Sequence, residues 1–441
     1  MQVPPSSTER ARSHGRAPST GDDRRRVAPL TRQLTRGPLD ADGDDPLSAL
    51  TPANLSPSPL PTRVRSPARR ALSPQDGSSR GIDDMPSKDF SFLQDPSAYH
   101  ILPAASIPPP FINPPSLPSP SIPISTLLFS GHYRLAASLC TRNILSCSPH
   151  DHQTLFHLFH TRLACLCLLG EHALAAQESK LLGDLNSAFY RHPLTNAHLV
   201  SWDLRVLAVR LSALGYGEWR KGIMGYYELA RECRENIVKA STSEDEKKTW
   251  RARLRDCGIR VANVLVEMGD LEGAGRHLST LSTDEGDVDK DIAIMETLVW
   301  LRVGDIAAAR RCLSSATSST LTNATLTALL HLADSDFEAA TTAFRALYDE
   351  HPDDAMVAQN LAVCLVYTGR ISEAKTVLET LVDQSAPFHS MVFNLSTVYE
   401  LCTERNRDRK MSLAGKLAAR KDGGGMGWEM SASEFKLAPV A

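Results

Sequence analysis

The apolar residues in the C-terminal third of this chain recur at a fixed interval. Between Leu321 and Tyr399, five apolar positions of one copy reappear as apolar residues 34 positions later, so that Ala340 is followed by Ala374 and Phe344 by Leu378. Within each copy these residues stand three or four positions apart, which is the spacing of one face of an α-helix. A third copy begins near residue 389. The pattern therefore predicts pairs of helices that pack on their neighbours along the chain.

A period of 34 residues, with apolar residues at helical spacing and two small alanines, is the signature of tetratricopeptide repeats. We predict an all-α tetratricopeptide solenoid over residues 125–420, with regular repeats at about 321–354, 355–388 and 389–420. The residues expected to pack the repeats together are Ala328, Phe337, Ala340, Phe344, Leu361, Ala362, Ile371, Ala374, Leu378, Leu395 and Tyr399.

Turns of the same kind extend toward the N-terminal half of this region, but their spacing becomes irregular. Each has a glycine or small polar residue, which permits a tight turn, followed by an apolar residue and alanines. The turn positions are Gly131, Gly170, Gly215, Gly269, Gly304, Ser335 and Gly369. Between the third and fourth of them, Ser243 and Glu246 form a capping box that predicts a long helix ending near Met268.

The first 124 residues have a different composition, with 23 of the 28 prolines of the chain. Such a segment buries too little apolar surface to offset the entropy of ordering, so we predict a disordered arm over residues 1–124. Pro46–Leu50 and Phe90–Leu93 are candidate partner-binding motifs, with chance apolar clusters as the alternative. Residues 101–124 are expected to act as a stiff polyproline spacer.

Four serines of the arm precede proline and are candidate phosphorylation sites: Ser56, Ser58, Ser66 and Ser73. Phosphorylation would add roughly −1.5 to −2 charge per site beside several arginines and reverse a local basic field. The arm would then regulate binding.

The last residues form a separate C-terminal region, 421–441. Residues 405–420 read as a basic terminal helix, and Gly423–Gly425 as a flexible break. Trp428–Leu437 reads as an apolar tail, which we expect to fold back over the exposed end of the last repeat, because open solenoid ends need a cap.

Composition and charge narrow the function. The formal net charge of −3 gives no reason to expect a nucleic-acid partner, and neither a signal peptide nor a membrane span is recognisable. Nine cysteines without a CxxC pair favour a soluble protein of a reducing compartment. The cluster of His150, Asp151, His152, His157 and His160 lacks the spacing of a metal site. We therefore expect no enzyme activity, no metal and no cofactor.

The repeats allow one class of partner, acidic chaperone C-termini, to be tested against the sequence. Some tetratricopeptide domains bind acidic chaperone C-termini with inward Lys, Asn and Arg side chains. This chain has Asn263, Asn360 and Asn394, but Ile259, Met356 and Ser390 stand at the neighbouring inward positions in place of cations. An adaptor for a chaperone peptide, or for a signalling partner regulated through the Ser-Pro arm, is the alternative function.

Several stretches resemble the subunit 12 family of the trafficking protein particle (TRAPP) complexes. They are LLFSGHYRLAASLC at Leu127–Cys140, RLACLCLLGEHALAAQES at Arg162–Ser179, AVCLVYTG at Ala362–Gly369, VFNLSTVYEL at Val392–Leu401 and EFKLAPVA at Glu434–Ala441. The match is weaker through residues 183–248 and in the glycine run.

The resemblance implies a non-catalytic scaffold subunit of a TRAPP III assembly of the metazoan and filamentous-fungal type. Such a complex tethers vesicles and acts as a Rab-family exchange factor in endoplasmic-reticulum-to-Golgi transport and autophagy. The implied partners are the large TRAPP subunits 8 and 11, and indirectly the Rab GTPase. The implied location is cytoplasmic, with peripheral association at endoplasmic reticulum, Golgi or intermediate-compartment membranes through the complex.

Overall fold

The computed structural model describes residues 88–437 except 116, 120, 241–242, 282–289, 316–319, 422 and 424–426. The predictions for residues 1–87, which include Pro46–Leu50 and the four serines Ser56, Ser58, Ser66 and Ser73, lie outside the described residues. So do the predictions for Gly424 and Gly425 and for the last residues of the tail, 438–441.

The described residues are helical, and their one β-type pairing is an isolated bridge between Arg191 and His198. Four short 3-10 helices are η3 (Ser91–Gln94), η4 (Pro96–Ala98), η5 (Lys180–Leu182) and η6 (Ala188–Tyr190). The first α-helices are α1 (Pro109–Ile112), α2 (Ile124–Phe129), α3 (Tyr133–Ser146), α4 (His152–Leu168), α5 (His172–Ser179), α6 (Trp202–Tyr216) and α7 (Trp219–Lys239). They continue as α8 (Glu244–Met268), α9 (Leu271–Leu281), α10 (Lys290–Val303), α11 (Ile306–Ser315) and α12 (Thr320–Ala333). The last are α13 (Phe337–Glu350), α14 (Ala355–Tyr367), α15 (Ile371–Gln384), α16 (His389–Cys402) and α17 (Asn406–Ala418).

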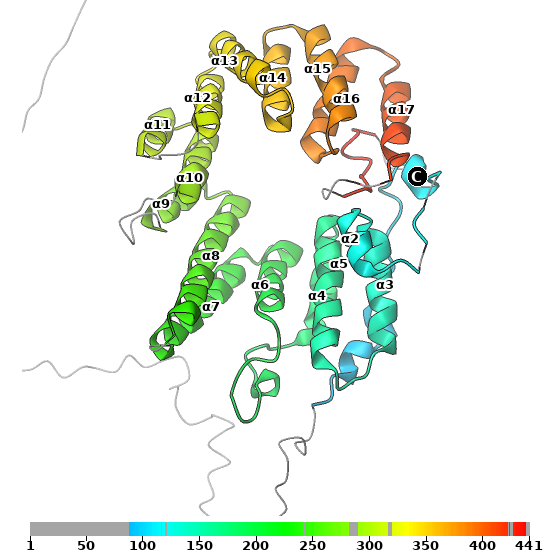
Figure 1. The fold of residues 1–441 in the computed structure, drawn as a ribbon, viewed down its shortest axis with the longest axis vertical. Coiled ribbons are helices and arrows are strands. Elements are labelled where there is room, and N and C mark those ends of the chain that lie inside the picture. Colours follow the sequence, from blue (N-terminus) through cyan, green and yellow to red (C-terminus); the bar gives the residue numbers. More distant parts are fainter. Residues whose placement is uncertain are drawn as a thin grey trace, which may run out of the picture. The chain divides into compact units, whose positions relative to one another are not determined.

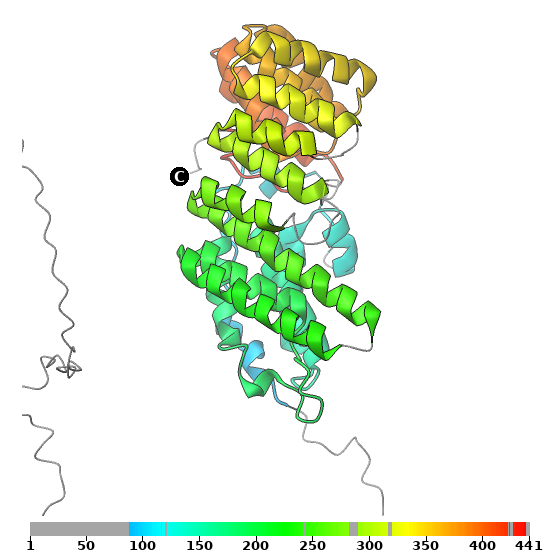
Figure 2. The ribbon, with the colours of Figure 1, turned by 90° about the vertical axis from the view of Figure 1, so that its left-hand side faces the viewer.

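Each helix from α3 to α17 packs on its neighbour in the chain, as expected for a solenoid of helix pairs (Figures 1 and 2). The prediction of an all-α tetratricopeptide solenoid is thereby confirmed. The long helix is also confirmed, since α8 runs to Met268 and its first turn is capped by Ser243, whose Oγ accepts a hydrogen bond from the Glu246 N–H at 3.4 Å.

Six of the seven predicted turns lie where the sequence placed them. Their central residues have left-handed backbone, with φ between 63° at Ser335 and 92° at Gly269. The prediction for Gly215 is wrong, because the turn falls at Gly217, with φ of 68°. Gly215 lies inside α6, where an added Cβ would stand 2.1 Å from the Cβ of Ala176. This glycine therefore permits α5 and α6 to approach closely, and it does not form the turn.

The largest apolar cluster surrounds α13 to α17. Nine of the eleven predicted packing residues are buried in it: Ala328, Ala340, Phe344, Leu361, Ala362, Ala374, Leu378, Leu395 and Tyr399. Ile371 is partly buried against the same cluster, and Phe337 stacks on Tyr367 with ring centroids 4.7 Å apart.

The prediction that residues up to 124 are disordered is wrong for residues 88–112, which we call the strap. Phe90 and Leu93 of the strap are buried in the cluster around α4, and the Phe90 ring meets the Phe156 ring edge-on at 5.0 Å. Lys88 donates to the Phe189 carbonyl at 2.5 Å, and Gln94 donates to the Cys147 carbonyl at 2.6 Å. The motif Phe90–Leu93 is thus bound within the chain, and is not a free partner-binding motif.

The remainder of the strap is not a polyproline spacer, because Ile107 and Phe111 are buried in the cluster of α13 to α17. The strap therefore contacts the apolar cluster near the first helices at one end and the cluster of the last helices at the other. Its prolines limit secondary structure to short helical turns, but they do not prevent burial.

Ala374 tests the close approach of α14 and α15. Its side chain is fully buried, so Ala374→Leu should force the helices apart and lower the free energy of unfolding by about 1–3 kcal/mol through overpacking. Urea denaturation followed by circular dichroism measures this change. The matched control is Ala333→Leu, at the exposed end of α12, which should leave the midpoint nearly unchanged. Equal stability of the two variants would contradict the assigned packing.

Candidate functional site

The first and last helices of the array meet at residues 427–437, which we call the tail segment (Figure 1). We call this meeting of the tail segment with α1 to α3, α16 and α17 the junction. Backbone hydrogen bonds tie the two ends: Gly423 N–H donates to the Ser130 carbonyl at 2.9 Å, Trp428 N–H donates to Gly131 at 2.9 Å, and Ala432 N–H donates to Ser106 at 2.7 Å.

The tail segment buries its apolar side chains at the junction. Trp428, Met430 and Phe435 are each less than 5% exposed. The Phe111 ring of the strap lies 5.3 Å from the Trp428 ring and 6.1 Å from the Phe435 ring. The prediction that the tail covers the last repeat is confirmed by its place in that apolar cluster. Its contact with the first helices was not predicted.

Gly131 is required where the tail segment crosses the turn between α2 and α3. A Cβ at this position would lie 2.8 Å from the Trp428 backbone nitrogen, which is closer than real Cβ contacts. The backbone of Gly131 also has φ of 80°, a conformation that other residues rarely adopt. The glycine read from the sequence as a turn residue therefore also makes room for the tail.

An ion pair fixes how the tail segment lies on α3. Arg134 donates from Nε to Oε2 of Glu429 and from Nη2 to Oε1, both at 2.8 Å. The Glu429 side chain is 11% exposed and the Arg134 side chain 23%. Bidentate pairing of this kind is directional as well as strong, so it selects one position of the tail along the helix.

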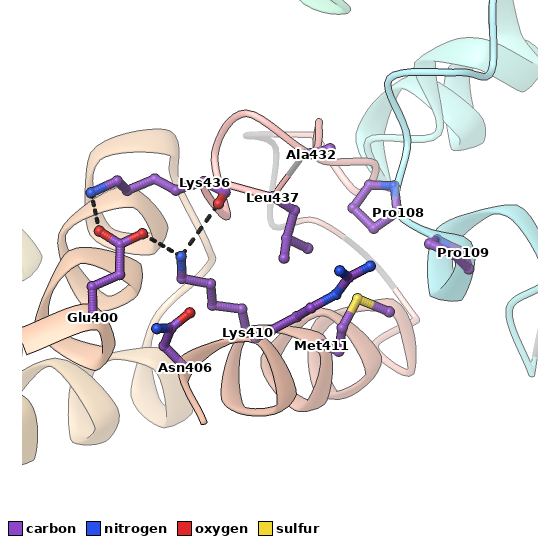
Figure 3. A pocket seen from close by; sticks show the side chains of 10 residues that line it. Pro108, Pro109, Glu400, Asn406, Lys410, Met411, Ala432, Lys436 and Leu437 are labelled. Carbon is purple, nitrogen blue, oxygen red and sulfur yellow. Dashed lines mark hydrogen bonds and ion pairs between the residues drawn. The ribbon is translucent and has the colours of Figure 1, made fainter. Parts of the chain in front are cut away.

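A second polar group joins the tail segment to α16 and α17 (Figure 3). The Glu400 carboxylate accepts from Lys410 Nζ at 2.5 Å and also from Lys436 Nζ. Lys410 further donates to the Lys436 carbonyl at 3.3 Å. The hydrogen bonds from Lys410 and Lys436 hold the pKa of Glu400 below its ordinary value. Two of the stretches that resemble the subunit 12 family, Val392–Leu401 and Glu434–Ala441, therefore contribute Glu400 and Lys436 to one ion-pair network.

A pocket of about 300 Å³ opens beside this network. Its lining comes from four separate segments: Pro108 and Pro109 at the start of α1, Glu400 of α16, the first turns of α17, and Ala432, Lys436 and Leu437 of the tail segment (Figure 3).

At its other end the strap is held by a buried ion pair between α4 and α5. Arg162 donates from Nε to Glu178 Oε2 and from Nη2 to Oε1, each at 2.6 Å, and both side chains are at most 3% exposed. His100 of the strap donates its backbone N–H to Glu178 at 3.0 Å, and its carbonyl accepts from Arg162 at 3.1 Å. These added hydrogen bonds satisfy the remaining polar atoms of the buried ion pair, which has little access to water.

The structure does not bring the histidine cluster or the clamp positions named from the sequence together in a site. Asp151 caps α4 by accepting from the Thr154 N–H at 3.2 Å, and His157 is exposed on that helix. Within the described residues, no three His, Cys, Asp or Glu side chains are grouped so that they could hold a metal ion. Of the clamp positions, Met356 is 62% exposed and the Ser390 hydroxyl lies 3.1 Å from Gln359 Oε1.

The contact of the tail segment with α3 was not predicted from the sequence. Arg134 and Glu429 are 295 positions apart, and neither belongs to the 34-residue period. The only sequence feature that indicated the junction is the apolar tail Trp428–Leu437, and it predicted a contact with the last repeat alone. The described part of the chain also has no helix with the length and hydrophobicity needed to cross a membrane.

Comparison with known proteins agrees with this architecture. Residues 331–395 match the family model described as tetratricopeptide repeat. The match agrees with the helix pairs α13 to α16, and it identifies residues 331–395 as tetratricopeptide repeats.

The chain is related in sequence to trafficking protein particle complex subunit 12. It is 24% identical to the mouse protein over 345 residues, which are 68% of this chain and 43% of the mouse protein. It is 23% identical to the human protein over 346 residues, which are 68% of this chain and 46% of the human protein. The chain thus spans less than half the length of these relatives.

Two solved structures are also similar. A tetratricopeptide repeat protein from Parabacteroides merdae is 13% identical, with 60% of this chain and 91% of that chain covered and a TM-score of 0.37. The assembly chaperone of RpL4 is 14% identical, with 65% and 96% covered and a TM-score of 0.27. These scores are too low to carry any statement about function.

Loss of the Arg134–Glu429 pair should loosen the tail segment. Glu429→Gln removes the charge and one arm of the bidentate contact, which costs roughly 1–3 kcal/mol for a hydrogen bond between charged groups. Hydrogen exchange at the Trp428 and Gly423 amides should therefore become at least fivefold faster. Glu404→Gln, on an exposed residue between α16 and α17, is the control. Unchanged exchange in Glu429→Gln would show that the pair does not hold the tail.

The Glu400 network should make the junction sensitive to acid. Because the folded-state pKa of Glu400 lies below its unfolded value near 4.5, its carboxylate stabilises the junction above that pH. The stabilisation is lost as the pH falls through the lowered folded value. Trp428 fluorescence, recorded from pH 6 to pH 3, should report this loosening of the tail.

Glu400→Gln isolates that contribution. Burial raises the pKa of Glu434, so this residue contributes stability with the opposite sign, present at low pH and lost as the pH rises. The difference between wild type and Glu400→Gln removes Glu434 from the comparison. Parallel pH profiles for the two proteins would mean that Glu400 does not stabilise the junction.

Proposed function

We propose that this chain is a non-catalytic scaffold subunit of a TRAPP III-type tethering and Rab guanine-nucleotide-exchange complex. In this proposal it acts in endoplasmic-reticulum-to-Golgi transport and autophagy, in the cytoplasm and at the surface of the membranes concerned. The observation that carries the proposal is the similarity to mouse and human subunit 12 across 68% of this chain. The partners are the large subunits 8 and 11, and through the complex the Rab GTPase.

The helix pairs support a scaffold role, because stacked repeats present an extended surface on which partner chains bind. Buried thiols support it as well. Burial raises the pKa of Cys140 and Cys364 to about 11 and that of Cys165 to about 12, so these thiols are protonated and unreactive near neutral pH.

A surface for another subunit is available on α14 and α16. Met356 and Tyr367 are 62% and 64% exposed, and they lie 11 positions apart on one face of α14. Phe393 and Leu401 are 40% and 54% exposed on α16, the second helix along. Exposed apolar side chains on adjacent repeats are typical of protein interfaces. We assign this surface to a TRAPP subunit.

Affinity purification tests the proposal. The tagged full chain, isolated from a gentle lysate of its own cells, should recover TRAPP subunits, with 8 and 11 among the most abundant by mass spectrometry. The double variant Met356→Glu and Tyr367→Glu should reduce their recovery at least tenfold, because it places charges in the interface. Val238→Glu, at a 77% exposed position of α7, is the control. Recovery of no TRAPP subunit by the wild-type chain would refute the assignment.

A further inference from the structure

The pocket at the junction has the chemistry of a peptide site. We propose that it binds an extended segment of a partner protein in which acidic and aliphatic residues alternate. This inference does not depend on membership of a TRAPP complex, since it rests on the pocket alone.

Charge is the first reason. Three cations line the pocket, Arg407, Lys410 and Lys436, against the single carboxylate of Glu400, which leaves a formal charge of +2. Glu400 is shared between the two lysines, so it neutralises only one of them. Arg407 is exposed and forms no ion pair with any residue that the structure describes. An acidic ligand would neutralise the remaining positive charge of the pocket.

The start of α17 adds to the attraction. This helix begins at Asn406, which lines the pocket, and its N-cap residue Arg405 makes no side-chain capping hydrogen bond. The first backbone N–H groups of a helix are not used within the helix, and they carry partial positive charge. The N-terminal end of α17 therefore adds partial positive charge next to the cationic side chains of the pocket.

Apolar walls are the second reason, and they favour a peptide over a small anion. Pro108 and Pro109 form one wall, while Met411 and Leu437 lie on the side of α17 and the tail segment (Figure 3). A phosphate ion would leave these apolar walls without a contact. A segment with alternating side chains would direct aliphatic groups onto these walls and carboxylates toward Arg407.

The pocket exists only when the junction is closed. Its walls come from the strap, α16, α17 and the tail segment, which are brought together by the contacts of Trp428, Phe435 and Phe111. A ligand that contacts all of them binds the closed junction and stabilises it by mass action. Binding should therefore slow hydrogen exchange of the Trp428 amide, which lies outside the pocket.

A labelled peptide tests the proposal on the full chain. The probe is an eight-residue fluorescein-labelled peptide of alternating Asp and Leu, and binding is followed by fluorescence anisotropy. We expect saturable binding that weakens with added salt, because Arg407 is exposed to solvent. Arg407→Glu should weaken binding at least tenfold, and Met411→Ser should weaken it severalfold.

Arg409→Glu provides the matched control, since it makes the same charge change at an exposed position of α17 that does not line the pocket. It should alter the dissociation constant less than twofold. Equal weakening by Arg407→Glu and Arg409→Glu would reveal general charge attraction and overturn the proposal. Equal binding of a peptide with Ser in place of Leu would overturn it in the same way, and so would the absence of saturable binding.

Residues 438–441 follow Leu437 directly in the sequence, so this segment is the competing occupant. A chain that stops at Leu437 distinguishes the two cases. If the wild-type chain binds the probe, and the shortened chain binds it no more than twofold more tightly, the partner site is supported. Binding that appears only after residues 438–441 are removed would assign the pocket to the chain itself and overturn the proposal.

Discussion

Burial of one short segment holds both ends of the described helices. Trp428, Met430 and Phe435 lie between the strap and the last two helices, and each buried side chain of this size contributes roughly 1.5–3 kcal/mol. The Arg134–Glu429 pair is partly exposed and contributes less than the three side chains together. Apolar burial therefore supplies most of the stability of the junction, whereas the ion pair and the backbone hydrogen bonds to Ser106, Ser130 and Gly131 fix its register.

This closure changes how the repeats depend on one another. In an open solenoid each repeat contacts only its neighbours, so stability is close to a sum of local terms and the ends are the least stable parts. Here α17 is covered by the tail segment, and the tail segment is held by α3 and by the strap. The strap is in turn fixed at His100 by Arg162 and Glu178. Opening at either end thus disturbs the other, and the terminal helices share one cooperative unit.

The sequence predicted those parts of the fold that depend on local or periodic signals. Ala340 and Ala374 repeat at 34 residues, and Ser243 with Glu246 marks the start of α8, so helix pairing and helix limits followed from neighbours in the chain. The ordered structure of the strap was not predicted, because its prolines resemble those of a disordered arm. Phe90 and Phe111 of the strap are nevertheless buried. Gly215 and Gly217 stand two positions apart, and the structure separates them by the left-handed backbone of Gly217 and the contact of Gly215 with Ala176. The contact of Arg134 with Glu429 has no periodic signal at all.

Residues that the repeat packing explains differ in the same way from the charged residues of the junction. Residues of the regular repeats, such as Ala362 and Leu378, are accounted for by packing, which any tetratricopeptide array requires. Glu400, Lys410 and Lys436 are different, because a covered helix end needs no ion-pair network and would be stable with apolar residues alone. Three charges gathered at the edge of an apolar cap fix the position of the tail while leaving a cationic opening beside it. At the junction, therefore, polar contacts outside the repeat pattern fix how the last helices and the tail segment are arranged.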